Sequence, residues 1–222
     1  MTVAARSLFQ WLRPSFPRSL SKPFERGLAA YERGRYLEAF KLWKLASQAG
    51  DAVASYRIGL LYAKNQGVAG SLPDAVVWYE RAAQLGHVDA QFQLGLIFLY
   101  GVKAELGPNR PETWRQSSAV RLGDKASDAH DLVFPHGTSV TRDLDAAFRW
   151  ISAAAEAGKA EAQTILGNMY KEELGCAKDY AAALRWYQAA ADQKFAPGEF
   201  ALGDVYYQGR GVPVDFEQAA IW

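Results

Sequence analysis

This 222-residue sequence lacks several features on which common protein classes depend. It has a single cysteine, Cys176, so an intramolecular disulfide framework cannot form. No run of about 18 apolar residues is present, which argues against a transmembrane helix. The formal net charge is only +1, so charge favours neither a nucleic acid nor a membrane surface as a partner. We therefore expect a cytoplasmic protein whose 50% hydrophobic residues build a core.

Motifs that carry catalysis are absent as well. The sequence contains no Walker loop, dinucleotide fingerprint, HExxH, CxxC or GxSxG element. The string GRGV at 209–212 is interpreted as a turn between helices. Cys176 follows a glycine in an equivalent turn and is interpreted as a small buried residue rather than a nucleophile. We predict a protein that is not an enzyme and that has no catalytic residues, no cofactor and no metal.

Tryptophan, by contrast, recurs at a fixed interval. Six of the seven tryptophans follow one another at spacings of 35 or 36 residues: Trp43, Trp78, Trp114, Trp150, Trp186 and Trp222. A period of about 20–50 residues is typical of repeat proteins, in which similar units stack on their neighbours. Proteins of this kind usually work through the surface that the stack presents, so a binding surface is the functional feature to expect.

Glycine forms a second series. Gly59, Gly95, Gly167 and Gly203 each lie 19 residues before a tryptophan. Apolar spacing around both series predicts two helices in each unit, helix A with the glycine and helix B with the tryptophan followed by an alanine pair. A glycine inside a helix costs about 1 kcal/mol relative to alanine, so its recurrence indicates close contact between helices.

The segments that carry these residues resemble a known repeat. AVASYRIGLLY (52–62), DAQFQLGLIF (89–98) and EAQTILGNMY (161–170) represent helix A, and YAAALRWYQAAADQK (180–194) represents helix B. Together with GRGVPVD (209–215) they resemble the Sel-one-like (Sel1-like) repeat, a relative of the tetratricopeptide repeat. The resemblance covers most of residues 24–222. It implies an all-α, right-handed α-solenoid of stacked antiparallel helix pairs, with the A helices on the concave face. It also implies a role as an interaction scaffold or adaptor, for example as a module of a larger bacterial protein.

Two parts of the chain depart from the repeat. Residues 1–22 are interpreted as a Pro-containing basic leader, because residues 1–26 carry five basic side chains and one acidic side chain. Residues 102–137 lack the consensus, and we interpret them as an eroded helix B followed by an eroded helix A. A 36-residue loop is the alternative. The predicted solenoid, 23–222, then has six units: 23–50, 51–86, 87–123 with a long connector at 102–111, 124–158, 159–195 and an incomplete 196–222.

A stripe on helix A is expected to bind the partner. Positions three before and one, four and five after each glycine should face away from helix B, since a helix turns 100° per residue. The predicted contacts for a partner peptide or helix are Tyr56, Leu60, Lys64, Phe92, Leu96, Leu99, Tyr100, Phe200, Asp204 and Tyr207. Two alternatives remain open, because aromatic residues before the glycine could pack on the next unit and the leader could cover the stripe.

Two other functions stay open. A metal-binding, ligand-binding or hydrolytic site could be centred on 124–137, where polar residues gather: Asp124, Asp128, His130, Asp131 and His136. Residues 3–12 could instead anchor a membrane-peripheral scaffold. His87, at a boundary between units, is interpreted as a solvated turn residue. The sequence leaves the partner's identity and the oligomeric state open.

Overall fold

The computed structural model describes residues 18–101 and 139–222, and this part of the chain folds into ten α-helices. The predicted all-α class is confirmed. The helices are α1 (Arg18–Glu32), α2 (Tyr36–Gln48), α3 (Ala52–Ala63), α4 (Leu72–Gln84), α5 (Val88–Tyr100), α8 (Leu144–Glu156), α9 (Ala160–Glu172), α10 (Tyr180–Ala191), α11 (Ala196–Gln208) and α12 (Phe216–Ile221).

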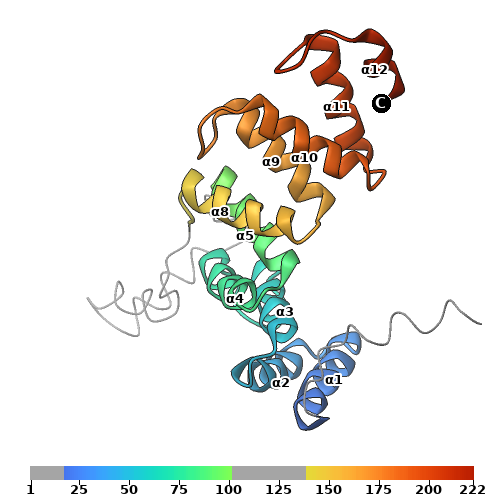
Figure 1. Cartoon of the computed structure of the whole chain (residues 1–222). Helices are drawn as coiled ribbons and strands as arrows, with labels where there is room; N and C mark the ends of the chain where they lie inside the picture. Colours follow the sequence, from blue (N-terminus) through green and yellow to red (C-terminus); the bar gives the residue numbers. More distant parts are fainter. Residues whose placement is uncertain (1–17, 102–138) are drawn as a thin grey trace, which may run out of the picture.

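The helices pack as pairs that stack in one elongated row. The pairs are α1/α2, α3/α4, α5/α8, α9/α10 and α11/α12, and α2, α4, α8 and α10 each contact the first helix of the next pair. In Figure 1 the first pair lies at one end of the row and the last pair at the other. This arrangement is an α-solenoid, in which each unit contacts only its neighbours. Helix α1 begins at Arg18, inside the predicted leader, while residues 1–17 are outside the described part.

Four of the five B helices in the described residues begin at a polar residue that caps them. The side chains of Ser71, Asp143, Asp179 and Asp215 each accept a hydrogen bond from a backbone N–H three residues later, at 2.9–3.2 Å. Such a bond satisfies one of the free donors of the first helical turn and contributes about 1 kcal/mol. In these four helices the short polar residue before the apolar stretch therefore sets where helix B starts, whereas α2 follows Arg35, which makes no side-chain cap.

Repeating glycines let the two helices of a pair approach closely. A β-carbon on Gly59 would lie 2.5 Å from two ring carbons of Tyr79, and one on Gly167 would overlap the ring of Tyr187. Both tyrosines are almost fully buried. The preceding residue of helix B is the repeated tryptophan, and Trp78 packs half-buried against the core of the first unit. Helices α4 and α10 thus present a tyrosine to their own pair and a tryptophan to a cluster that includes the pair before.

Helix α8 is the partner of α5, although 43 residues separate the two helices. Ile151 of α8 contacts Gly95 in the position that Tyr79 and Tyr187 take in other units. The Asp143 N–H donates to the Phe98 carbonyl at 2.9 Å. The same bond closes two other pairs, from Asp179 to Tyr170 at 3.1 Å and from Asp215 to Tyr206 at 3.0 Å.

This pairing differs from the expected unit order. From the sequence, the helix at 144–156 was expected to pack on an eroded helix within 124–137, whereas α8 packs on α5 as a complete pair. The part of the chain that the structure describes therefore holds five helix pairs, and the eroded helices expected at 102–137 fall outside it. Repetition explains the difference, because every A helix carries the surface that suits every B helix.

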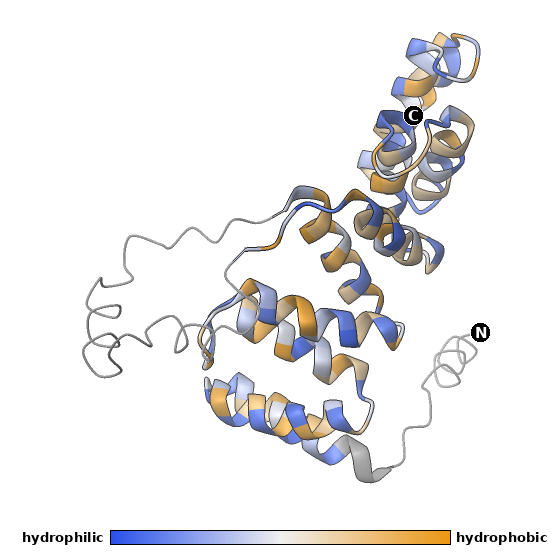
Figure 2. Ribbon diagram, turned by 90° about the vertical axis from the view of Figure 1, so that its left-hand side faces the viewer, coloured by the Kyte–Doolittle hydropathy of each residue, from blue (hydrophilic) through white to orange (hydrophobic). Residues whose placement is uncertain are grey.

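The core runs along the row as a series of clusters. Apolar and polar residues share each helix (Figure 2), and the apolar side chains gather between neighbouring helices. One cluster joins α4 to α5 and another joins α8 to α9, so each cluster links adjacent units. Within the described residues no helix is both long and apolar enough to cross a membrane.

Candidate partner-binding surface

Helix A carries the exposed aromatic side chains that sequence analysis predicted for a partner. Tyr100 at the end of α5 is 71% exposed, and Phe200 and Tyr207 of α11 are 77% and 62% exposed. Lys64, which caps the end of α3, is exposed as well, and Asp204 is half-buried. Since large aromatic residues are enriched where proteins meet, these positions are candidate contacts.

Other residues of the predicted stripe pack between units. Tyr56 and Leu60 of α3 contact the cluster of α4 and α5, and the Tyr56 ring stacks on His87 with centroids 4.4 Å apart. Phe92 of α5 packs against the cluster of α8 and α9. The sequence left open whether such residues bind a partner or pack on a neighbouring unit. At these three positions the side chains pack on a neighbouring unit. Leu96 is half-buried on the same stripe.

A lysine covers one of these rings. The Lys159 ammonium, in the turn between α8 and α9, lies 5.0 Å from the centre of the Phe92 ring. It also pairs with Asp89 at 3.0 Å and with Glu161 at 3.6 Å. Burial lowers the pKa of Lys159, but the hydrogen bond and charge of Asp89, with the charge of Glu161, outweigh it and raise the pKa overall. The ammonium therefore stays charged and ties α5 to the next unit.

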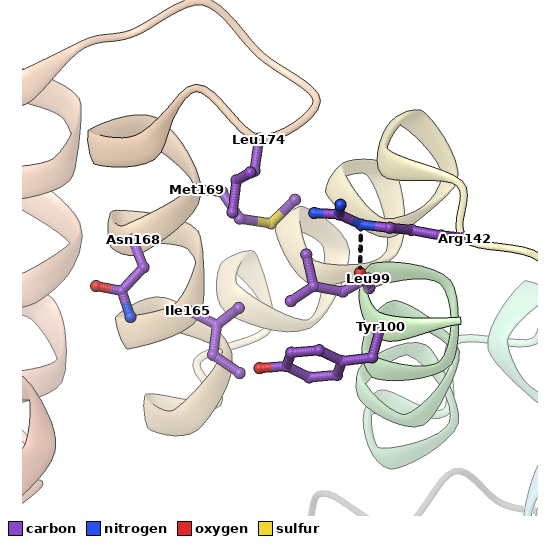
Figure 3. Close-up of a pocket in the computed structure, with 7 residues that line it drawn as sticks. All are labelled: Leu99, Tyr100, Arg142, Ile165, Asn168, Met169 and Leu174. Atoms are coloured by element: carbon purple, nitrogen blue, oxygen red, sulfur yellow. Dashed lines mark hydrogen bonds between the residues drawn. The ribbon is translucent and has the colours of Figure 1, made fainter. Parts of the chain in front are cut away.

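A hollow opens farther along the same face, between α5 and α9. It measures about 370 Å³ and is lined by Leu99, Tyr100, Arg142, Ile165, Asn168, Met169 and Leu174. These side chains come from α5, from the segment before α8 and from α9 with the turn after it, and that of Asn168 points away from the others (Figure 3). Leu99, predicted as a partner contact, is only 6% exposed and forms part of the wall.

Arg142 marks the rim of this hollow. Its Nε donates a hydrogen bond to the Leu99 carbonyl at 2.9 Å, which holds the guanidinium beside the hollow (Figure 3). Arg142 is not among the predicted contacts, because it lies in a connector outside the repeating helix pattern. Ile165, Met169 and Leu174 are not among them either, since the wall that they form exists only once α9 stands beside α5.

A second apolar area lies on α11 and α12. The Tyr207 ring meets Phe216 of α12 edge-on, with centroids 5.6 Å apart, and both residues remain exposed. Asp204 accepts a short hydrogen bond from Gln208 one helical turn later. Phe200 lies two turns before Tyr207 on the same helix. The exposed aromatic residues thus gather at two places, the end of α5 and the α11/α12 pair.

Side chains suited to metal binding or catalysis do not gather in the described residues. There, no group of three or more His, Cys, Asp or Glu side chains is placed to hold a metal ion. Burial raises the pKa of the Cys176 thiol, aided by the charges of Glu173 and Asp179, so the reactive thiolate is disfavoured. The polar residues predicted at 124–137, and the possible membrane anchor at 3–12, lie outside the described residues.

His87 has a structural role. Its Nδ1 accepts a hydrogen bond from the Ala90 N–H at 3.2 Å and so caps the start of α5. The expectation of a solvated turn residue is wrong, because the ring is half-buried against Tyr56. Burial lowers the pKa of His87, in spite of the opposing charge of Asp89, so the neutral ring that can accept this bond is favoured.

Comparison with known proteins agrees with the helix pairs. The Sel1 repeat family matches residues 25–51, 52–87, 88–112, 136–159, 160–195 and 196–222. The chain belongs to the Sel1 repeat family. The two matches at 88–112 and 136–159 contain α5 and α8, the helices that form one pair across the widest gap. Sel1 repeats commonly mediate protein–protein interaction and are generally non-catalytic scaffolds.

Individual relatives share the repeat over limited lengths. An F-box protein of Arabidopsis thaliana is 31% identical over 96 residues, which cover 43% of this chain and 27% of the plant protein. Chitin synthase regulatory factor 3 of Schizosaccharomyces pombe is 29% identical over 148 residues, or 63% of this chain and 16% of the yeast protein. This Sel1 repeat chain therefore spans less than a third of either relative.

A solved structure shares the fold. A Sel1 repeat protein from Oxalobacter formigenes superposes with a TM-score of 0.69 at 22% sequence identity. The match covers 95% of this chain and 74% of that protein. The Sel1 repeat solenoid is thus common to both.

Proposed function

We propose that this chain is a non-catalytic protein–protein interaction scaffold whose A-helix face binds a peptide or helix of a partner. The observation that carries the proposal is the exposure of Tyr100, Phe200 and Tyr207 on A helices of a protein built from Sel1 repeats. Each of these side chains exposes more than 60% of its surface. Aromatic side chains of this kind supply a large share of the binding energy at protein interfaces.

Contacts between units support the proposal by holding the face rigid. The interfaces between helix pairs are filled by Tyr56, Leu60 and Phe92. Lys159 joins two pairs through its ion pair with Asp89. A rigid face loses little conformational freedom when a partner binds, so more of the contact energy appears as affinity. The half-buried residues thus hold the exposed aromatic residues in place. Lys64 and Asp204 supply polar groups at the edge of the proposed binding face.

Affinity capture from native lysate tests the proposal. Wild type is compared with a Tyr100→Ser/Phe200→Ser variant, which truncates two exposed rings without disturbing the core. The matched control is Leu37→Ser/Leu45→Ser, since both leucines are exposed on the B helix α2. We expect a partner that wild type and the control retain and that the A-helix variant loses. Identical partner sets for all three proteins would contradict a site on the A-helix face.

A further inference from the structure

The hollow between α5 and α9 has an apolar wall and one cationic group at its rim. Ile165 and Leu174 supply accessible apolar surface, and the almost fully buried Leu99 and Met169 lie behind them, so two neighbouring units build the wall. Its volume, about 370 Å³, is at the lower end of the range of roughly 300–1,000 Å³ in which small ligand sites fall. The hollow can therefore take an apolar side chain of a partner.

The polar groups around the hollow are mainly hydrogen-bond donors. The Leu99 carbonyl is occupied by Arg142 Nε at 2.9 Å, and within residues 18–101 and 139–222 the two terminal nitrogens of the guanidinium donate no hydrogen bond. Asn168 Oδ1 is likewise occupied, because it accepts a hydrogen bond from the Tyr187 hydroxyl at 2.8 Å. The Tyr100 ring extends from α5 toward Ile165, with its hydroxyl at the rim (Figure 3). The guanidinium has only donors, so a partner group that pairs with Arg142 accepts hydrogen bonds.

The charge of Arg142 further limits which partner group can bind at the rim. Arg142 is exposed, and none of the ion pairs within residues 18–101 and 139–222 involves it. A guanidinium anchored through Nε presents its remaining N–H groups in the geometry that a carboxylate matches with two parallel hydrogen bonds. The leader has the wrong charge for this rim, because residues 1–26 carry five basic side chains and one acidic side chain.

We infer that the hollow binds a segment of a partner protein in which an apolar side chain stands directly beside a carboxylate. The apolar side chain packs against Ile165 and Leu174, with Leu99 beneath them, while the carboxylate pairs with Arg142. Tyr100 covers the open side of the bound segment. The inference rests on the proposed function and adds to it the chemistry of the partner.

Selection from a peptide library tests the inference while the partner is still unidentified. Random 12-residue peptides displayed on phage are selected against the full chain, against Arg142→Gln and against Arg142→Glu. The matched control is Arg149→Glu, an exposed arginine on α8 away from the lining of the hollow. Melting temperatures establish that all four proteins are folded, and Arg142→Gln retains a side-chain donor for the Leu99 carbonyl.

The expected result is a specific change in the selected peptides. Wild type and Arg149→Glu should enrich Asp or Glu directly beside Leu, Ile, Met or Phe. Arg142→Gln should keep the apolar preference without the acidic one, and Arg142→Glu should prefer basic residues. For the most enriched peptide made synthetically, Arg142→Gln should raise the Kd about tenfold or more, because a hydrogen bond to a charged group contributes about 1.5–3 kcal/mol.

Two other results would overturn the inference in distinguishable ways. Peptides that show no acidic preference, or that bind Arg142→Glu as well as wild type, would refute the role of the hollow and leave the proposed scaffold function intact. If wild type enriches no peptide above the background of an unrelated protein, both the inference and peptide binding by the A-helix face are refuted.

Discussion

At the scale of single residues, the stability of the solenoid depends on pH through His87. It joins two units, since its ring stacks on Tyr56 of α3 while its Nδ1 caps α5. Protonation converts Nδ1 into a donor and removes the cap. Because burial holds the pKa of His87 below its usual value of 6.5, the unfolded chain binds this proton more readily than the folded protein. Asp89 and Asp51 oppose this shift, and Arg57 adds to it.

We therefore expect the contribution of His87 to stability to be complete above pH 6.5 and to decline as the pH falls through 6.5 toward the folded pKa. His87→Asn keeps a capping side chain that does not titrate. Between about pH 7.5 and 5.5 the wild-type melting temperature should fall about 2–4 °C more than that of the variant, since an N-cap contributes about 1 kcal/mol. Differential scanning calorimetry at both pH values provides the measurement, and equal declines would contradict a titrating cap.

At the scale of the element, the helix pairs depend on the absence of a β-carbon at one position. A β-carbon on Gly59 would lie 2.5 Å from the Tyr79 ring, whereas one on Gly203 would meet only the Ala219 carbonyl at 3.3 Å and two more distant atoms of Trp222. Tyr79 is 2% exposed and has no space to move into. Helix α12, by contrast, is short and exposed, so it can shift by a few tenths of an ångström.

The two glycines should consequently respond to alanine in opposite directions. Gly59→Ala should lower stability by about 1–3 kcal/mol, because overpacking outweighs the better helix propensity of alanine. Gly203→Ala should leave stability unchanged or raise it by up to about 1 kcal/mol. Thermal unfolding of both variants, followed by circular dichroism, checks the contrast. An equal loss at both positions would show that the close contact at Gly59 is not what requires glycine.

At the scale of the whole molecule, the α5/α8 pair has the same backbone hydrogen bond between its two helices, from Asp143 to Phe98, as pairs with short connections. Seven residues separate α9 from α10, and seven separate α11 from α12. Deleting 103–138 would leave Gly101, Val102 and 139–143, which is also seven residues. The backbone N of Arg142 already lies 2.9 Å from where a β-carbon on Gly101 would be, so the two ends of the pair are close together.

We expect the chain without 103–138 to keep its solenoid and the five helix pairs of residues 18–101 and 139–222. Its melting temperature should lie within about 4 °C of the wild-type value, the change that roughly 1 kcal/mol produces in a chain of this size. Circular dichroism and thermal unfolding measure this, and small-angle X-ray scattering reports the length of the stack. A loss of cooperative unfolding would show that the pairing of α5 with α8 depends on the deleted residues.

The local pattern of the sequence determined the helices and their repetition. Apolar spacing predicted which segments are helical, and the glycine series that includes Gly59 predicted where the two helices of a pair come close. Short polar residues such as Asp179 and Asp215 set the starts of the B helices. These features depend on contacts within a few turns or within one period, so the order of residues along the chain is sufficient to encode them.

Pairing and exposure were decided by the tertiary structure alone. Repeated surfaces are interchangeable, so the sequence could not show that α8 packs on α5 across 43 residues. Nor could it separate Tyr56, which the next unit covers, from Tyr100, which stays 71% exposed. The hollow beside Arg142 likewise exists only where two units meet. Burial depends on which helix stands opposite, and that is a property of the assembled stack.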